Sequence, residues 1–262
     1  MLSPRTTTSA RSRRTASIGL ALAVLATGGT VGAGSATAGP PSAAVSTATV
    51  TAAPSALSTL PMAITSTLRP GSRGPQVLEL QRRLSSLGYW LGTANGTFGP
   101  LTTQAVYALQ GAAGLSRDGV VGPATRAALA KGTRPTVRST GRALEVDLAR
   151  GLAIFVRDGR AFRILHTSTG TFTKYTHEGK SYLADTPRGS WRVSWRVNGV
   201  RDGELGEMYK PIYFHHDGIA VHGYGSVPPY PASHGCVRVT NAAIDMIWRE
   251  RLMPSNMRVR VY

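Results

Sequence analysis

The chain has 262 residues, which is long enough for two modest domains that each bury a core of their own. Thirty Lys and Arg residues against thirteen Asp and Glu residues give a net charge of +17, and such a balance favours an anionic partner. The arginines are scattered rather than gathered in a block, which argues against nucleic acid as that partner, and a single cysteine excludes an internal disulfide framework.

The first 38 residues have the features of a secretory signal peptide. Four arginines precede a short apolar run at residues 18–26, and Ala36-Thr37-Ala38 offers small residues for cleavage before Gly39. The run is too short for a convincing transmembrane span. Arg13-Arg14 is compatible with twin-arginine export, so the Sec and twin-arginine routes both stay open. We expect an exported protein, wall-associated or secreted, with no stable membrane span once the peptide is removed.

Residues 39–66 consist mainly of Ala, Ser, Thr and Pro and carry no charge. Such a segment cannot bury enough apolar surface to offset the entropy of ordering it, so the composition predicts a disordered tether. No candidate site residue falls within it.

Residues 67–131 predict a small helical domain. Three Gly-Pro pairs, at 74–75, 99–100 and 122–123, place proline in the first turn of a helix, where its missing N–H costs nothing. Apolar residues follow the first two pairs at helical spacing, and Gly88 and Gly114 then stop the pattern. The turn at 95–102 is echoed at 118–125, so each half is a turn followed by a helix start. Three short helices around a Leu and Val core are expected.

Residues spread through this segment carry a family resemblance: Val77, Leu80-Gln81, Leu84, Leu87-Gly88-Tyr89, Asn95-Gly96, Phe98-Gly99, Thr102, Ala105-Val106, Gln110, Gly114-Leu115, Asp118-Gly119, Gly122 and Thr125. In these positions the segment closely resembles the peptidoglycan-binding domain found on many cell-wall enzymes. Asn95 and Leu109 depart from that family's usual Asp and aromatic residue. The resemblance implies peptidoglycan as a partner, and the alternative is a helical spacer with no ligand.

Residues 132–140 form a short polar linker, and beyond it the apolar pattern changes from helical to alternating. Alternation occurs at 144–148, 152–156, 162–164, 191–197 and 257–262, and Asn198-Gly199 is a strong signal for a type I′ hairpin. We expect residues 141–262 to form a mostly antiparallel, hairpin-connected β domain, sandwich-like or barrel-like, with one or two short helices. The fold class is therefore multidomain, with a small all-α domain followed by a β domain.

One helix should follow the cysteine. Thr240 or Asn241 can cap it, and an apolar stripe that includes Ile244 and Ile247 should pack on the sheet. Packing of this stripe would anchor the segment just after Cys236.

The stretch from His222 to Asn241 holds the residues best suited to chemistry. It contains the only cysteine, Cys236, among small and polar neighbours in a proline-rich loop. A thiol beside imidazoles can act as a nucleophile, because a nearby base generates the thiolate. Gly235 lets the backbone bend and bring N–H groups to a reacting carbonyl oxygen. An unpaired cysteine in an exported protein favours this interpretation over a buried structural thiol.

Several motifs of residues 141–262 match one further family: Leu144-Glu145-Val146-Asp147-Leu148, Ser168-Thr169-Gly170, Thr186-Pro187-Arg188-Gly189-Ser190-Trp191-Arg192-Val193, His222-Gly223 and Ser233-His234-Gly235-Cys236-Val237-Arg238-Val239. With these motifs the segment resembles the L,D-transpeptidase catalytic domain. Arg188 stands where the family often has Thr, and the insert 171–184 lengthens the preceding loop. Both departures concern substrate preference rather than the chemistry.

The resemblance implies that Cys236 attacks the carbonyl of a tetrapeptide stem at its diaminopimelate–D-alanine bond and releases D-Ala. A second stem's side-chain amine then accepts the acyl group and forms a cross-link. His222 would be the base, with the Gly223 backbone carbonyl orienting its ring. His234 and Gly235 would shape the oxyanion loop.

Four further residues are candidate substrate contacts. Ser233 precedes the catalytic motif, and Arg238 and Asn241 follow it; the last two could contact the stem carboxylate or brace the loop. Tyr213 is the fourth candidate. No cofactor is expected, and the partner is peptidoglycan, bound by a protein that we expect to be a monomer.

A metal site is the alternative role for the histidines. His215, His216 and Asp217, together with His222 and His234, could gather around zinc. Adjacent histidines on a strand point to opposite faces, which disfavours a shared ion. Two other functions stay open, namely an L,D-carboxypeptidase or endopeptidase on the same scaffold and a non-catalytic wall-binding protein.

Overall fold

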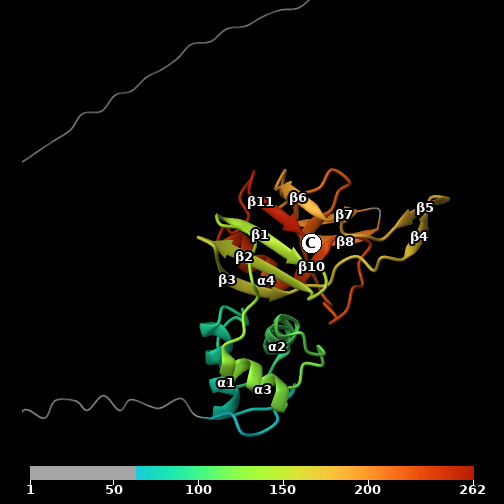
Figure 1. Ribbon diagram of the computed structural model, residues 1–262. Helices are drawn as coiled ribbons and strands as arrows, with labels where there is room; N and C mark the ends of the chain where they lie inside the picture. Colours follow the sequence, from blue (N-terminus) through green and yellow to red (C-terminus); the bar gives the residue numbers. More distant parts are fainter. Residues whose placement is uncertain (1–62, 204) are drawn as a thin grey trace, which may run out of the picture. The chain divides into compact units, whose positions relative to one another are not determined.

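The computed structural model describes residues 63–203 and 205–262 (Figure 1). The expected signal peptide, residues 1–38, and nearly all of the expected tether, residues 39–66, lie outside this range. None of the helices in the described range is both long and apolar enough to cross a membrane.

Three helices follow the three Gly-Pro pairs, as predicted. They are α1 (Pro75–Ser86), α2 (Pro100–Ala113) and α3 (Pro123–Lys131), and each begins at the proline of its pair. Helices α2 and α3 end on glycines in the left-handed region, Gly114 at φ 67° and Gly132 at φ 72°. Glycine is favoured there because it has no Cβ to clash with the backbone.

The internal echo has a physical basis in two buried glutamines. The Oε1 atom of Gln81 accepts hydrogen bonds from the backbone of Asn95 and Gly96, both at 2.8 Å. The Oε1 atom of Gln110 accepts the N–H of Gly119 at 3.0 Å in the second turn. Each helix therefore holds the turn that leads into the next helix.

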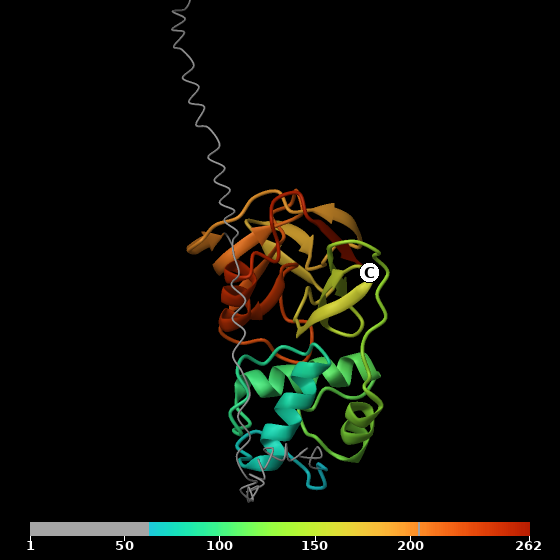
Figure 2. The same ribbon diagram turned by 90° about the vertical axis from the view of Figure 1, so that its left-hand side faces the viewer.

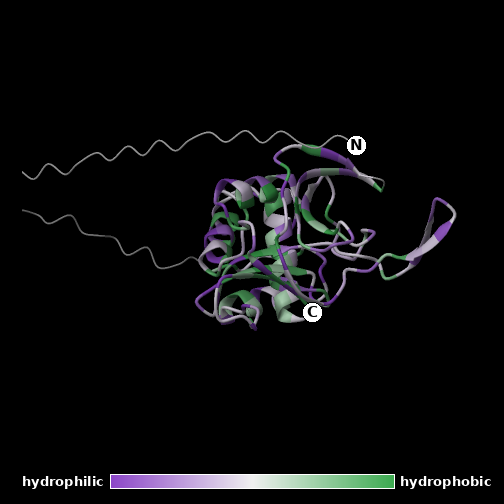
Figure 3. Ribbon diagram, turned by 90° about the horizontal axis from the view of Figure 1, so that it is seen from above, coloured by the Kyte–Doolittle hydropathy of each residue, from purple (hydrophilic) through white to green (hydrophobic). Residues whose placement is uncertain are grey.

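The rest of the described chain is mostly β structure, with one helix, α4 (Asn241–Arg249). The strands are β1 (Ala143–Asp147), β2 (Leu152–Arg157), β3 (Arg160–His166), β4 (Lys174–His177), β5 (Lys180–Leu183), β6 (Gly189–Arg192), β7 (Val200–Gly203), β8 (Gly206–Tyr213), β9 (Ala220–Tyr224), β10 (Val237–Thr240) and β11 (Arg258–Val261). A five-stranded sheet has the order β3-β2-β1-β11-β6, and a four-stranded sheet has the order β10-β9-β8-β7. Strands β4 and β5 form a separate hairpin that projects from the domain (Figures 1 and 3).

The two larger sheets and α4 share a core of buried aliphatic side chains, which gives the sandwich-like arrangement that was expected. Thr240 caps α4 by accepting the N–H of Ala243 at 3.1 Å. The predicted fold class is confirmed, with one qualification. Strands β1 and β11 pair in parallel, as do β9 and β10, so hairpins do not connect every neighbour.

The hairpin predicted at Asn198-Gly199 is wrong. The chain runs through these residues and keeps the same partner, since Val197 N donates to Pro211 O and Val200 pairs with Tyr209 in β8. The turn occurs later, between Gly203 and Gly206. The local Asn-Gly signal is overridden because pairing with β8 extends on both sides of it.

The three helices lie next to the β domain (Figure 2), and the two share a second hydrophobic core. Buried residues of β2 and β3, such as Ile154 and Ile164, pack with the apolar residues of the helices. The backbone at Gly88–Trp90 also pairs with β3, because Trp90 N donates to Ile164 O and Ile164 N donates to Gly88 O. We call residues 67–131 the helical domain and note that its core continues into the sheet.

Candidate active site

The parallel pairing of β9 with β10 brings the two halves of the candidate site together. Val237 lies opposite Val221 and Arg238 lies opposite His222. Side chains alternate between the faces of a strand, so Val221 and Val237 enter the core, where both are fully buried. Cys236, just before β10, therefore falls on the same side as His222 and Arg238.

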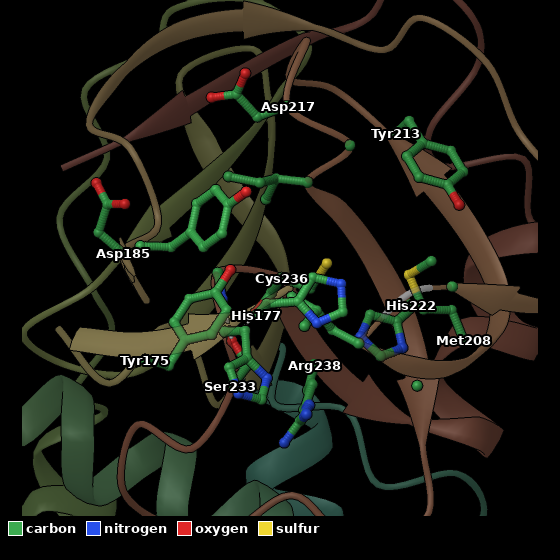
Figure 4. A pocket seen from close by; sticks show the side chains of 18 of the residues that line it. Tyr175, His177, Asp185, Met208, Tyr213, Asp217, His222, Ser233, Cys236 and Arg238 are labelled. Carbon is green, nitrogen blue, oxygen red and sulfur yellow. Dashed lines mark hydrogen bonds between the residues drawn. The ribbon is translucent and has the colours of Figure 1, made fainter. Parts of the chain in front are cut away.

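That side opens into a pocket of about 760 Å³. Its lining includes residues of the β4–β5 hairpin, of β7, β8 and β9, and of the segment from Ser233 to Arg238. In Figure 4, Cys236 lies in the middle of the pocket, with His222 on one side of it and Arg238 below. The carboxylates of Asp185 and Asp217 lie on the opposite side of the view from His222.

His222 is buried, and its ring is fixed by a local hydrogen bond. Its Nδ1 atom lies 2.9 Å from the backbone oxygen of Gly223. A carbonyl oxygen only accepts, so Nδ1 carries the proton and Nε2 of the neutral ring keeps its lone pair. Burial lowers the pKa of His222 to about 4, with the Gly223 hydrogen bond opposing this and the charge of Arg238 adding to it. The ring is therefore neutral near pH 7 and able to accept a proton.

Cys236 is half-buried and is a free thiol. Burial raises the pKa of the Cys236 thiol, while the backbone hydrogen bond of Ala220 and the charge of Arg238 lower it in part. The thiol is therefore protonated near pH 7 in the free protein.

The turn before Cys236 needs glycine at position 235. Gly235 has φ +147°, and a Cβ there would lie 2.7 Å from the backbone oxygen of Asp185. Thr186 braces the turn, because its Oγ1 donates to Gly235 O at 2.6 Å. The N–H of Gly235 is also engaged, since it donates to Ser233 Oγ at 3.0 Å. That N–H is therefore held inside the turn.

Ser233, expected as a substrate contact, has its hydroxyl engaged within the same turn. It is 2% exposed, and its Oγ donates to Cys236 O at 2.6 Å while accepting the Gly235 N–H. The structure thus gives Ser233 a bracing contact around the cysteine.

Arg238 and Asn241, also predicted from the sequence, lie in different places. Arg238 lines the pocket with its guanidinium 4.0 Å from the ring centre of Tyr224, and it donates to Ala232 O at 2.8 Å. Asn241 is not among the pocket residues; its Oδ1 lies 2.7 Å from where a Cβ on Gly223 would be. The side chain of Asn241 therefore lies against Gly223 rather than in the pocket, and its role stays a prediction.

His234 and Tyr213 both line the pocket. His234 is exposed, and the edge of its ring meets Tyr175 of the β4–β5 hairpin at 4.7 Å between centroids. Tyr213 is only 3% exposed and stacks on Trp195 at 4.1 Å. Its hydroxyl is buried and has no hydrogen-bond partner among the described residues. Burial raises the pKa of Tyr213. The charge of Arg201 lowers this pKa in part, and the nearby Cys236 raises it further.

Two site features were missed in the sequence. Thr186 lies in a motif that matched the transpeptidase family, but no local pattern showed that its hydroxyl would reach Gly235, 49 residues away. The role of the insert 171–184 was unassigned. Part of this insert forms the β4–β5 hairpin, and Tyr175, Tyr182 and Leu183 form one wall of the pocket.

The prediction that His215 and His216 point to opposite faces of a strand is wrong. These residues lie in a turn rather than a strand, and their rings stack at 4.1 Å. With Asp217 they place three potential ligand atoms within 4.8 Å of one another. In the part of the chain that the structure describes, this group includes neither His222 nor His234.

Comparison with known proteins agrees with the fold and with the motifs. Residues 141–261 match the family model of the L,D-transpeptidase catalytic domain, and residues 73–129 match that of a peptidoglycan binding domain. A solved L,D-transpeptidase from Xylanimonas cellulosilytica is 48% identical with a TM-score of 0.73, over 75% of this chain and 98% of that one. The chain belongs to the L,D-transpeptidase family.

Curated relatives match over shorter stretches. An N-acetylmuramoyl-L-alanine amidase from Bacillus licheniformis is 41% identical over 91 residues, which is 32% of this chain and 25% of the relative. A probable amidase from the same organism is 42% identical over 64 residues, 24% of this chain and 18% of the relative. The chain spans a quarter or less of these curated relatives.

Proposed function

We propose that this protein is an exported peptidoglycan L,D-transpeptidase that works through a thioester on Cys236. Its acyl donor is a tetrapeptide stem, and its acceptor is the side-chain amine of a second stem. The observation that carries this proposal is the common face of β9 and β10, which places Cys236, His222 and Arg238 in one pocket.

The first half-reaction breaks the diaminopimelate–D-alanine amide. The Sγ of Cys236 adds to the carbonyl carbon as Nε2 of His222 takes the thiol proton. The same proton then passes to the departing nitrogen, so D-Ala leaves as a neutral amine and a thioester remains. The Gly223 carbonyl stabilises the imidazolium that forms in between, because it accepts the Nδ1 proton.

The second half-reaction transfers the acyl group. The incoming amine adds to the thioester and gives up a proton to His222, and collapse of the adduct returns the sulfur of Cys236 to its thiol form. Both adducts carry negative charge on the former carbonyl oxygen. The Cys236 N–H and the Tyr213 hydroxyl are suited to stabilise it, because the first adjoins the sulfur and the second is a buried donor without a partner among the residues that the structure describes.

Substrate recognition draws on both charge and shape. Arg238 and Arg201 line the pocket and can pair with stem carboxylates, while Tyr175 and Tyr182 offer flat surfaces at the hairpin. The net charge of +17, which becomes 17 − 4 = +13 once the four arginines of residues 1–38 are removed, favours accumulation on an anionic wall. Binding of the helical domain to peptidoglycan and removal of a signal peptide at residue 38 complete the proposal.

Incubation of the mature chain with a purified disaccharide tetrapeptide tests the reaction, with products read by mass spectrometry. A cross-linked dimer with released D-Ala is the expected result. A shortened stem without dimer would instead make the protein a hydrolase, and no product with intact binding to sacculi would make it a wall-binding protein. A dimer formed equally by Cys236→Ser would contradict the thioester mechanism.

A further inference from the structure

The loop that joins the two halves of the site is held mainly by contacts to residues outside it, including a backbone hydrogen bond from Ala232 N to Thr169 O at 3.0 Å. Residues 225–232, here called the proline loop, connect β9 to the turn that ends in Cys236. Three of the eight residues are proline, at positions 228, 229 and 231. Proline has no N–H, so the loop cannot build a backbone ladder, and its carbonyl groups depend on donors from elsewhere.

Side chains from outside the loop supply those donors. Four loop carbonyls accept side-chain hydrogen bonds: Val227 O from Gln104 Nε2 at 3.0 Å, Pro228 O from His166 Nε2 at 2.8 Å, Tyr230 O from Ser168 Oγ at 2.8 Å, and Ala232 O from Arg238 Nη1 at 2.8 Å. Three of these donors belong to the β domain. Gln104 belongs to helix α2 of the helical domain, more than a hundred residues earlier in the chain.

Helix α2 presents one face to the β domain at this point. Gln104, Tyr107 and Gly111 recur at helical spacing, so they lie on the same face. The edge of the Tyr107 ring meets His166 at 5.3 Å between centroids. At Gly111 the helix comes so close that a Cβ would lie 2.3 Å from the backbone oxygen of Arg150. The helix therefore contacts one loop donor, His166, and supplies another itself.

Gln104 is poorly arranged for stability alone. Its Nε2 donates to Val227 O, but its Oε1 is buried and has no hydrogen-bond partner among residues 63–203 and 205–262. A buried acceptor left unpaired costs free energy that a single neutral hydrogen bond barely offsets. An apolar side chain of the same length would avoid that cost. The contact to the loop is what the glutamine provides and an apolar side chain cannot.

We propose that Gln104 is a positioning residue of the active site. By holding the proline loop it fixes where the Cys236 turn lies relative to His222 on the neighbouring strand. The helical domain is then a structural part of the catalytic unit as well as a wall-binding element. This inference rests on the proposed roles of Cys236 and His222, and it acts through the geometry of their proton transfer, which tolerates displacements of only about 0.5 Å.

The test compares four full-length proteins by tetrapeptide turnover, intact-mass acylation and thermal unfolding. Gln104→Met keeps the side-chain length, removes the donor and removes the orphaned acceptor. We expect kcat to fall about fivefold with KM unchanged and Tm not lowered, because the loop shifts while packing is kept. Gln104→Lys restores a donor and should recover most of kcat.

The matched control is Gln76→Ala in helix α1. Gln76 belongs to the same domain, but its hydrogen bonds go to Thr65 and Ser66, away from the loop. It should keep wild-type kcat.

A Gln104→Met variant with wild-type kcat would overturn the inference. So would a loss of kcat that accompanies a lower Tm and is not rescued by Lys, since that pattern marks a merely structural role. If wild-type protein forms no acyl adduct at Cys236, the proposed function itself fails, and the inference with it.

Discussion

The floor and the rim of the pocket are built in different ways. The floor is the face of β9 and β10, where backbone pairing sets the register of His222 and Cys236 and the strands are buried on their other side. The rim includes the β4–β5 hairpin, whose Tyr182 and Leu183 are 42% and 52% exposed. A ladder anchored in a core fixes atoms closely, whereas an exposed hairpin has few contacts to do so. We therefore place the chemistry on the floor and substrate selection on the rim.

The most severe test of this division is Cys236→Ser. The hydroxyl is far less acidic than the thiol and stays protonated beside a neutral imidazole, so turnover should fall by about 10⁴-fold or more. Mass spectrometry after exposure to a carbapenem, to which the family resemblance implies sensitivity, should show an adduct on wild type and none on the variant. An adduct mapped to another residue would remove Cys236 from the nucleophile role.

The next largest effect is expected from His222→Ala. Loss of a general base costs typically 10²–10⁴-fold, so acylation should fall by about 10³-fold at pH 7. His234→Ala is the matched control, because His234 is exposed and lies against the hairpin. It should lower acylation by less than about tenfold through loss of support for the turn. The reverse ranking of these two variants would transfer the base to His234.

The pH dependence of wild-type acylation is a second test of His222 as the base. Because burial lowers the pKa of His222 to about 4, its ring stays able to accept a proton well below pH 6.5. The rate of acylation, measured across pH 3 to 8, should therefore fall on the acid side with a midpoint near pH 4 rather than near pH 6.5.

The lowered pKa of His222 should also make the stability of the fold depend on pH. Below about pH 6.5 the unfolded chain binds a proton at His222 that the folded chain does not, so the free energy of unfolding falls as the pH drops toward 4. His222→Ala should reduce that slope. A slope equal to that of wild type would contradict the lowered pKa of His222.

How much of this the sequence reveals depends on how local the signal is. The helix starts at Pro75, Pro100 and Pro123 were predictable, because a Gly-Pro pair acts within one turn. Cys236 and His222 were predicted as site residues from motifs, and alternation along strands explains why they lie on one side once the strands pair. The pairing itself, which is parallel, carries no local signal.

Most of the missed features depend on contacts between distant residues. Asn198-Gly199 has the composition of a hairpin turn, but pairing with β8 on both sides of it decides the outcome. His215 and His216 share a side because the chain turns there before β9. Thr186 reaches the Cys236 turn from a separate loop, and Gln104 reaches the proline loop from a separate domain. No periodicity in the sequence encodes such distances.

A smaller effect is expected where floor and rim meet, at Tyr213. Tyr213→Phe removes only the buried hydroxyl, so kcat should fall about tenfold if that group stabilises the oxyanion. Stability should stay the same or rise, because an unpaired buried donor is removed. Tyr209→Phe is the control, since its hydroxyl donates to Asp245 at 3.0 Å and its loss should leave kcat unchanged. Equal kcat for Tyr213→Phe and wild type would leave the Cys236 N–H as the main oxyanion donor.

The smallest effect is expected on the rim itself. Tyr175 stacks on Tyr182 across the hairpin at 5.5 Å and makes an edge contact with His234, yet it belongs to neither the β9–β10 pairing nor the hydrophobic core. Tyr175→Ala should raise KM for the tetrapeptide about threefold, the loss of roughly 0.7 kcal/mol of aromatic contact, with kcat kept. Tyr230→Ala is the control, because Tyr230 is 62% exposed and lies outside the pocket lining. Alkylation of Cys236 by iodoacetamide, which needs no peptide recognition, should be the same in all three proteins. A fall in kcat or in alkylation for Tyr175→Ala would show that the hairpin also positions Cys236, through the contact of Tyr175 with His234. The division between floor and rim would then be wrong.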